Sequence, residues 1–285
     1  MTRVVPDSWL LIGSSSSIGQ SLDERLQRDE RPIYRTTRRG LPGTTQLTLG
    51  APRPDLPRPV GDGVAVLTAA ATGQLQCELA PEATRIVNVD ATVELARELL
   101  ESGWRLIYLS SEAVFPEFAG RCSVASVRQP RNEYGRQKVE VEEFLEGYPD
   151  QASILRLGKV LDLSRPPWVE WIPVLGSGGT CSAFSDYYLS PLTLKATADA
   201  IVSVAEAGCG GVWHAAAEQP ASYENFLRAY VNLTKMPGEV NGVKRSPESV
   251  HPGEPTYLES TRLVEAGHWV TPSIEDVLAS LTASP

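Results

Sequence analysis

The stretch Trp9-Leu10-Leu11-Ile12-Gly13-Ser14-Ser15-Ser16-Ser17-Ile18-Gly19 joins a short apolar run to a serine-rich turn with glycine at both ends. The apolar run predicts a buried strand, and residues 18–28 predict a helix directly after the turn. Glycine permits a tight turn and a close backbone approach to a ligand. A helix that starts there offers unpaired N–H groups and the positive end of its dipole to a pyrophosphate. This unit predicts a dinucleotide-binding turn of GxxGxxG type, with serine at the middle glycine position. The residues expected to bind the cofactor here are Gly13, Ser14, Ser16, Ser17, Ile18 and Gly19.

Further apolar runs alternate with helix-like segments along the first half of the chain. The predicted strands are residues 32–36, 46–49, 64–67 and 106–109. Val93, Ala96, Leu99 and Leu100 recur at helical spacing between the last two of these strands. Continuous apolar runs separated by helices indicate a parallel sheet covered on both faces. We therefore expect an α/β fold with a doubly wound parallel sheet of Rossmann type.

The rhythm of the sequence changes from about residue 162. The expected loops and irregular segments are 165–167, 176–180 and 237–255. The expected helices are 194–207, 224–233 and 274–281, with a strand at 212–214. We expect two units: a dinucleotide-binding domain of residues 1–162 with about 191–216, and a smaller α+β substrate-binding lobe of about 163–190 with 217–285.

Composition excludes several classes of function. The chain has 285 residues and a formal net charge of −9, which disfavours a nucleic-acid binder because such proteins need a basic surface. The four cysteines are scattered, so we expect neither a metal site nor a disulfide framework, but reduced and mostly buried thiols. No apolar run approaches the length of a membrane span, and no secretory signal is evident, so a cytoplasmic protein is expected.

The end of the second predicted strand bears on the choice of cofactor. A carboxylate there would bind a ribose hydroxyl, but the run 34–39 has none and contains Arg35, Arg38 and Arg39. A guanidinium group can pair with a 2′-phosphate through two hydrogen bonds. The run therefore favours NADP (NADPH) over NAD, with Arg38 as the first candidate and Arg39 as the second. The alternative interpretation is a solvated basic turn, with NAD as the cofactor.

A second motif predicts proton transfer. Residues 132–138 lead into a helix expected to end near Leu145, and Tyr134 and Lys138 lie four residues apart on one face of it. An ammonium group beside a phenol lowers the pKa of the phenol, so we expect a lowered pKa for Tyr134. Tyr134 would then donate a proton to a carbonyl oxygen, and Lys138 would also hold the cofactor ribose. The alternative is that both side chains only pack on an amphipathic helix.

The predicted strand at 106–109 continues into Ser110-Ser111-Glu112-Ala113-Val114-Phe115. Its hydroxyl groups follow the carboxyl end of a strand, where ligands of open α/β folds bind. Ser111 is therefore expected to donate a hydrogen bond to the same substrate oxygen as Tyr134.

Together these residues resemble the extended short-chain dehydrogenase/reductases (the NAD-dependent epimerase/dehydratase superfamily), and within them the dTDP-4-dehydrorhamnose reductases. The resemblance spans nearly the whole chain. The matching segments are 13–19, Ala69-Ala70-Ala71, Asn88-Val89-Asp90-Ala91-Thr92, 110–115, the Tyr134 and Lys138 pair, Leu155-Arg156-Leu157-Gly158, 184–193 and Gly211-Val212-Trp213-His214.

The resemblance implies reduction of the 4-keto group of a nucleotide-linked 6-deoxysugar by NADPH. Ser111 would polarise the ketone, Tyr134 would supply the proton, and Lys138 would tune Tyr134. The further cofactor-binding residues that it implies are Ala69, Ala70, Asn88 and Leu157. The implied partner is a nucleotide sugar, with no nucleic acid and no membrane, and a homodimer is the assembly to be considered.

Three positions at the implied sugar site depart from the family pattern. Ala113 stands where the reductases carry an aromatic residue, and Lys159 stands where they carry tryptophan. Glu112 replaces an aspartate. We expect all three to bind the substrate, with the chemistry kept and the substrate changed. Ala113 cannot serve as the second acid–base group that a dehydratase needs.

Two other functions remain open at this point. One is a nucleotide-sugar epimerase or dehydratase that retains NAD, and the other is a non-catalytic NADP-binding regulatory subunit. Among the other side chains, we expect His214 in the core and Trp168 and Trp171 either stacked at the mouth of the site or packed in the core. Lys244-Arg245 is a candidate for binding pyrophosphate, and His251 and His268 are candidates for touching a substrate phosphate.

Overall fold

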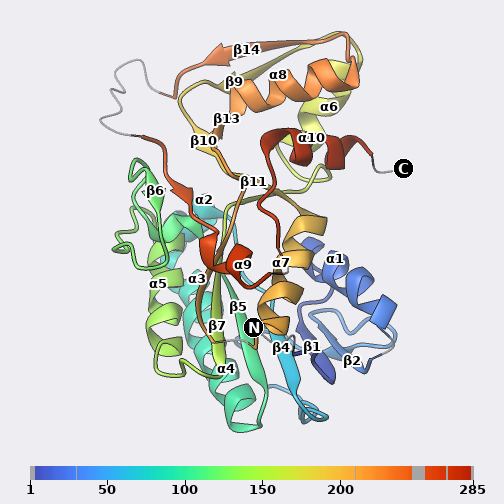
Figure 1. Cartoon of the computed structure of the whole chain (residues 1–285), viewed down its shortest axis with the longest axis vertical. Coiled ribbons are helices and arrows are strands. Elements are labelled where there is room, and N and C mark those ends of the chain that lie inside the picture. The colour runs from blue at the N-terminus through green and yellow to red at the C-terminus, as the bar shows by residue number, and fades with distance from the viewer. Residues whose placement is uncertain (1–3, 30, 209, 246–253, 268, 284–285) are drawn as a thin grey trace.

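The computed structural model describes residues 4–29, 31–208, 210–245, 254–267 and 269–283. It has a large α/β layer structure with a smaller lobe above one end, where α6, α8, α10, β9 and β14 lie (Figure 1). The chain passes between the two parts more than once, because α7 and β12 return to the large part after β9 and β10. His251 and His268 of the sequence analysis lie outside the described residues.

The large part is built on a parallel sheet with the strand order β12-β7-β5-β4-β1-β2-β3 within the described residues. These strands are β1 (Ser8–Ile12), β2 (Ile33–Thr37), β3 (Thr45–Gln46), β4 (Gly63–Leu67), β5 (Arg105–Ser111), β7 (Ala152–Leu157) and β12 (Gly211–Ala215). The order reverses between β1 and β4, which is the point where doubly wound sheets bind ligands at their carboxyl edge. The predicted doubly wound Rossmann-type fold is confirmed.

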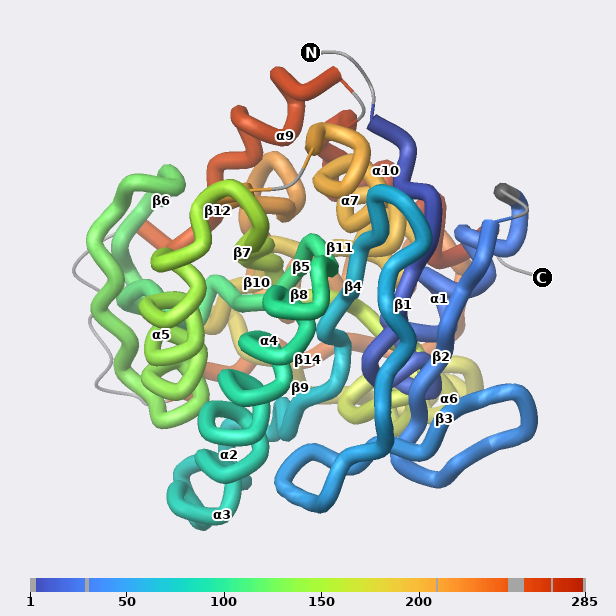
Figure 2. Tube along the Cα trace, turned by 90° about the horizontal axis from the view of Figure 1, so that it is seen from below, coloured from blue at the N-terminus to red at the C-terminus, as the bar shows by residue number. Residues whose placement is uncertain are grey.

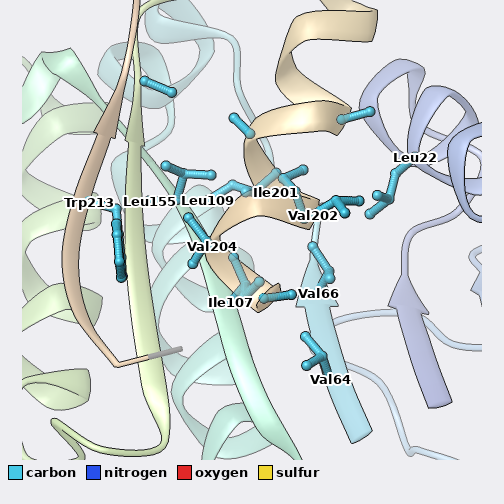
Figure 3. Close-up of a cluster of buried hydrophobic side chains, with 14 of the residues drawn as sticks. Leu22, Val64, Val66, Ile107, Leu109, Leu155, Ile201, Val202, Val204 and Trp213 are labelled. Carbon is cyan, nitrogen blue, oxygen red and sulfur yellow. The ribbon is translucent and has the colours of Figure 1, made fainter. Parts of the chain in front are cut away.

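Helices cover both faces of this sheet, as Figure 2 shows from below. One face carries α1 (Ser17–Leu26), η1 (Gln27–Asp29), α7 (Leu194–Glu206) and α9 (Thr261–Glu265); the other carries α2 (Gln74–Leu79), α3 (Pro81–Arg85), the π-helical turn η2 (Ile86–Asp90), α4 (Ala91–Glu101) and α5 (Glu133–Leu145). Figure 3 shows side chains of β4, β5, β7 and β12 meeting α7 and α1 on the first face. Each buried Leu, Val or Ile contributes about 1.5–3 kcal/mol, which makes this sheet a rigid platform for its carboxyl edge.

The smaller lobe has a hydrophobic cluster of its own. Its elements are α6 (Trp168–Gly176), β9 (Thr180–Phe184), β10 (Tyr188–Leu189), β13 (Ala221–Ser222), α8 (Tyr223–Thr234), β14 (Glu239–Val243) and α10 (Ile274–Thr282). Trp168 and Trp171 pack edge to face at 5.5 Å, and Trp168 packs against Phe226 at 5.7 Å. Trp168 is 2% exposed, so core packing is its main role.

Short elements tie the two parts together. They are η3 (Glu112–Val114), β6 (Arg121–Cys122), β8 (Lys159–Leu161), β11 (Pro191–Thr193) and β15 (Tyr257–Leu258). Strand β8 pairs with β11, and β6 pairs with β15. None of the described helices is long and apolar enough to cross a membrane.

Two sequence predictions were wrong in detail. Residues 46–49 were expected as a strand, but pairing covers only Thr45–Gln46, because the chain turns away from the sheet edge while Leu47 stays buried. Residues 237–255 were expected to be irregular, yet Glu239–Val243 forms β14 beside β9. Helix α6 was not predicted, because its pattern is apolar nearly all round.

Candidate active site

A cavity of about 880 Å³ opens at the carboxyl edge of the sheet, beneath the smaller lobe. The phosphate turn and the ends of β4, β5 and β7 line it from the large part, and α6, β10 and the start of α8 line it from the lobe. The predicted catalytic, cofactor and substrate residues that it brings together are Ser16, Ser17, Ile18, Ala70, Ser111, Glu112, Ala113, Tyr134, Lys138, Leu157 and Lys159. The further candidates Trp168 and Arg245 also line it. Residues spread over 144 positions of the sequence therefore share one chamber, from Ser16 to Lys159.

The phosphate turn has the backbone that a pyrophosphate needs. Gly13 has a φ of +91°, and a Cβ there would lie 2.9 Å from the Cβ of Ala69. At Gly19 a Cβ would lie 2.4 Å from the carbonyl oxygen of Gly13, so only glycine lets α1 start this close to the turn. Ser16 caps α1 by accepting from the N–H of Gly19 at 3.0 Å. The residues present thus fit a dinucleotide at this helix N-terminus.

Ser14, Ser16 and Ser17 differ in what they do. The hydroxyl of Ser14 is buried and donates to the carbonyl oxygen of Thr36, so it braces the turn. Ser16 donates to Thr68 on the loop after β4. Ser17 donates to Asp162, a carboxylate beyond β8 that also lines the cavity. Asp162 was not expected at the site, because it lies 145 residues from Ser17 in sequence.

Tyr134 and Lys138 point into the cavity from the first turns of α5. Asn132 caps this helix by accepting from the N–H of Gly135 at 2.7 Å. The Nζ of Lys138 donates to the carbonyl oxygen of Leu109 at 2.8 Å and lies 5.5 Å from the centre of the Tyr134 ring. It also lies 4.5 Å from the centre of the Tyr108 ring. Burial lowers the pKa of Lys138 to about 8, with the carboxylate of Glu142 acting in the opposite direction.

The expectation of a lowered pKa for Tyr134 was wrong for the protein without ligands. Burial raises the pKa of the Tyr134 hydroxyl well above its usual value, with a smaller contribution from Cys77. The ammonium group of Lys138 lies over the ring face and bonds to a carbonyl oxygen, so it does not offset desolvation. Tyr134 is therefore a neutral phenol, which is the form that donates a proton.

Ser111 ends β5 and caps the short helix η3. Its Oγ accepts from the N–H of Ala113 at 3.2 Å, so its own proton remains available for a substrate oxygen. Helix α5 packs closely against η3 at Gly135. A Cβ at this position would lie 2.2 Å from the carbonyl oxygen of Ala113, so only glycine fits. This glycine lets Tyr134 approach the strand end that carries Ser111.

A buried charge network supports the site from below. Arg156 donates to both oxygens of Glu142, with Nη2–Oε2 at 2.7 Å, and the exposed fractions of the two side chains are 2% and 0%. Ser110 donates to Glu142 at 2.5 Å, and Arg128 pairs with it at 3.1 Å. The fully buried His214 lies 3.3 Å from Arg156, and burial lowers its pKa to about 3, so it is neutral. His214 is a core residue, as expected.

Besides Arg38 and Arg39, five of the residues expected to bind the cofactor are not among those that line the cavity: Gly13, Ser14, Gly19, Ala69 and Asn88. Asn88 accepts from the N–H of Ala71 and donates to the carbonyl oxygen of Ala71 and to Gln137, so it shapes the loop beside Ala69 and Ala70. It is not among the lining side chains.

The arginines after β2 separate into two kinds. Arg35 forms a bidentate ion pair with Asp23 of α1, so its guanidinium group already has a partner within the protein. Arg38 and Arg39 are exposed, and neither lines the cavity.

The lobe adds two tyrosines that the sequence patterns did not single out and one predicted arginine. Tyr187 and Tyr223 stack at 5.3 Å above the cavity. Arg245, one of the two basic candidates, lies 4.5 Å from the centre of the Tyr187 ring and pairs with Glu117. No local periodicity marks these positions, because β10, α8 and the segment after β14 come together only in the folded lobe.

The structure describes three of the four cysteines. Cys77, Cys122 and Cys181 are buried free thiols, as expected, and Cys209 lies outside the described residues. No group of three or more His, Cys, Asp or Glu side chains in the described segments is placed to hold a metal ion.

Comparison with known families gives a match over residues 8–283 to the RmlD substrate binding domain. The chain belongs to this family. The resemblance to dTDP-4-dehydrorhamnose reductases is thereby confirmed. A comparison with curated proteins finds no match.

Solved structures share the fold. The dTDP-4-dehydrorhamnose reductase of Bacillus anthracis, solved with NADP, has a TM-score of 0.80 at 19% identity and covers 98% of this chain and 100% of its own. The hypothetical dTDP-4-dehydrorhamnose reductase of Sulfolobus tokodaii has a TM-score of 0.77 at 21% identity, covering 94% and 98%. The UDP-glucose 4-epimerase of Thermus thermophilus, solved with NAD, has a TM-score of 0.76 at 16% identity, covering 98% and 100%.

The three residues that depart from the family pattern, Glu112, Ala113 and Lys159, all line the cavity. Glu112 has a buried Oε2 without a hydrogen-bond partner among the described residues, and burial raises its pKa to about 8. Lys159 is exposed and lines the same cavity, and its charge lowers the pKa of Glu112 in part. Glu112 and Lys159 therefore place an acid and a cation at the same end of the cavity.

Proposed function

We propose that the protein reduces a keto group on a nucleotide-linked sugar or deoxysugar with NADPH. The observation that carries this is the meeting of Ser111, Tyr134 and Lys138 in one cavity with the phosphate turn. Membership of the RmlD substrate binding domain family supports the same reaction class.

We assign the cofactor to the large part and the substrate to the lobe. The turn 13–19, with the loop at Ala69 and Ala70 and the end of β7 at Leu157, would hold the dinucleotide. Arg38 and Arg39 would pair with the 2′-phosphate once it lies beside the end of β2. The proposed division is residues 1–162 with 191–216 for the cofactor and 163–190 with 217–285 for the sugar nucleotide.

The catalytic residues act on the substrate oxygen. When bound, NADPH supplies the hydride. Ser111 donates a hydrogen bond to the ketone oxygen, because its Oγ already accepts from Ala113 and its proton is free. As charge develops on that oxygen, the neutral hydroxyl of Tyr134 transfers its proton to it, which typically contributes about 10²–10⁴-fold. The ammonium group of Lys138 stabilises the phenolate that Tyr134 becomes.

A direct assay tests the proposal. Purified protein with NADPH and a nucleotide-linked keto-sugar should oxidise NADPH, so the absorbance of the reduced nicotinamide should fall. Tyr134→Phe should lower kcat by about 10²–10⁴-fold. Tyr148→Phe, three residues beyond the end of the same helix, is the matched control and should keep full activity. Normal turnover by Tyr134→Phe would refute the proposed mechanism.

The other two functions predict different results. An epimerase or dehydratase with retained NAD would purify with stoichiometric bound NAD and would show no net consumption of NADPH. A regulatory subunit would bind NADP without turnover of any keto-sugar. Ala113 leaves the strand end without a second acid–base group beside Glu112, which favours the reductase. A cytoplasmic location and a homodimer stay predictions.

A further inference from the structure

Lys159 lies at the end of the cavity near Ser111 and Glu112, which we call the sugar end. Lys159 starts β8, two residues beyond Leu157, and Leu157 pairs with Ser111 in the sheet. The side chain of Lys159 is therefore anchored close to the strand end that would hold the ketone. Among the described residues, no carboxylate lies within ion-pair distance of its ammonium group.

The acid nearest to this cation does not supply a full negative charge. Glu112 follows Ser111, its Oε2 is buried without a hydrogen-bond partner among the described residues, and its pKa of about 8 keeps it mostly protonated at neutral pH. The other titratable groups that interact with it are Tyr187, Tyr223 and Cys122, and burial raises the pKa of each.

The two other carboxylates that line the cavity, Glu117 and Asp162, both have partners. Arg245 and Glu117, which flank Tyr187, form an ion pair. Asp162, directly after β8, accepts hydrogen bonds from Ser17 and Ser164 and pairs with Arg165 at 3.6 Å. Arg131 and Lys138 also line the cavity, and Lys159 is the cation whose charge acts on the pKa of Glu112.

We propose that the substrate sugar carries a carboxylate, which Lys159 binds by charge and Glu112 binds as a hydrogen-bond donor. This inference rests on the proposed reductase function and names the substrate class of that site. A charge-assisted hydrogen bond from an ammonium group to a carboxylate is roughly twice as strong as a neutral one. The methyl group of a 6-deoxysugar would instead cover the ammonium group and give nothing in return for its lost hydration.

Two further features fit a carboxylate. The small side chain of Ala113, beside Glu112 on η3, leaves room for the two oxygen atoms of a carboxylate. A sugar carboxylate next to Glu112 would raise the pKa of Glu112 further, because like charges disfavour ionisation, and so would keep the donor protonated.

Calorimetry on the NADP-saturated protein tests this without turnover. The probes are UDP-glucuronic acid and UDP-glucose, together with the dTDP forms of the same two sugars. Within each pair, the ligands differ only in whether carbon 6 is a carboxylate or a hydroxymethyl group. We expect the acid to bind about 10-fold more tightly at pH 7. Lys159→Met should abolish the difference, whereas Lys195→Met, an exposed lysine of α7, should preserve it. Equal affinities, or a preference that survives Lys159→Met, would overturn the proposal.

Glu112→Gln separates the donor role from simple packing. In the unchanged protein, affinity for the acid should weaken above about pH 8, as Glu112 ionises. Glu112→Gln keeps a donor and should remove this pH dependence while leaving affinity at pH 7 within about 3-fold. An unchanged pH profile in this variant would refute the role of Glu112. Because these ligands need no reduction, failure of the keto-sugar assay and failure of this preference are separate outcomes.

Discussion

Lys138 bonds to the carbonyl oxygen of Leu109, two residues before Ser111, at 2.8 Å. This bond ties helix α5 to strand β5, the two elements that carry the proposed proton donor and the proposed ketone-binding hydroxyl. The ammonium group is therefore a structural link as well as a charge. Its position between the rings of Tyr108 and Tyr134 excludes water and lowers its pKa.

The pH dependence of catalysis should report Lys138. Its pKa of about 8 in the free protein means that the ammonium form is lost as pH rises through 8. With a keto-sugar saturating and NADPH varied, kcat/KM should therefore fall above about pH 8, approaching tenfold per pH unit. Lys138→Arg keeps its charge and should remove this fall, although its activity should be lower. A flat profile in the unchanged protein would contradict the assignment.

Gly135 should be intolerant of even one added carbon. A Cβ there would lie 2.2 Å from the carbonyl oxygen of Ala113, so Gly135→Ala must push α5 away from η3. We expect a stability loss of about 1–3 kcal/mol and a lower kcat, because Tyr134 moves with the helix. Urea denaturation and the keto-sugar assay measure the two effects.

Gly176→Ala is the matched control for this substitution. A Cβ at Gly176 meets nothing within 4 Å, and the residue ends helix α6. Alanine there should leave activity unchanged and stability equal or higher. Equal behaviour of the two variants would show that the close approach at Gly135 has no consequence.

The Glu142–Arg156 pair should show strong coupling. Removing either charge leaves the other buried at 0–2% exposure, which typically costs about 3–5 kcal/mol. Glu142→Leu and Arg156→Met should each destabilise strongly, and the double variant should be less destabilised than their sum. Arg228→Gln, which breaks an exposed pair with Glu224, should change stability by less than about 1 kcal/mol. Additive effects in a urea-denaturation cycle would argue against the network.

Cofactor selection should depend on Arg38. Arg38→Ala should raise the KM for NADPH about 10-fold or more while leaving the KM for NADH nearly unchanged, because only NADPH carries the 2′-phosphate. Arg35→Ala should instead lower stability, since Arg35 is paired with Asp23. Arg228→Ala is the surface control for lost positive charge. An equal rise in KM for NADPH and NADH would show that Arg38 does not bind the 2′-phosphate and belongs to a solvated basic turn.

The sequence by itself determined the features that depend on neighbouring residues. The strand, turn and helix at 8–26 follow from an apolar run, glycines and a serine cap, all within direct reach of one another. Tyr134 and Lys138 share a helix face because they are four residues apart, and the structure places both in the cavity. The doubly wound sheet followed from apolar runs that alternate with helices.

The tertiary structure decided what depends on burial and on distant contacts. It buried Tyr134 so that its pKa rises, although the adjacent Lys138 suggested the opposite. In the folded chain, Arg35 forms an ion pair with Asp23, and Asn88 forms a hydrogen bond with Ala71. Residues 239–243 pair with β9. Desolvation and pairing across many residues leave no local periodicity, because they depend on which surfaces meet after folding. The positions of Lys159 and Glu112 in one cavity belong to this second class.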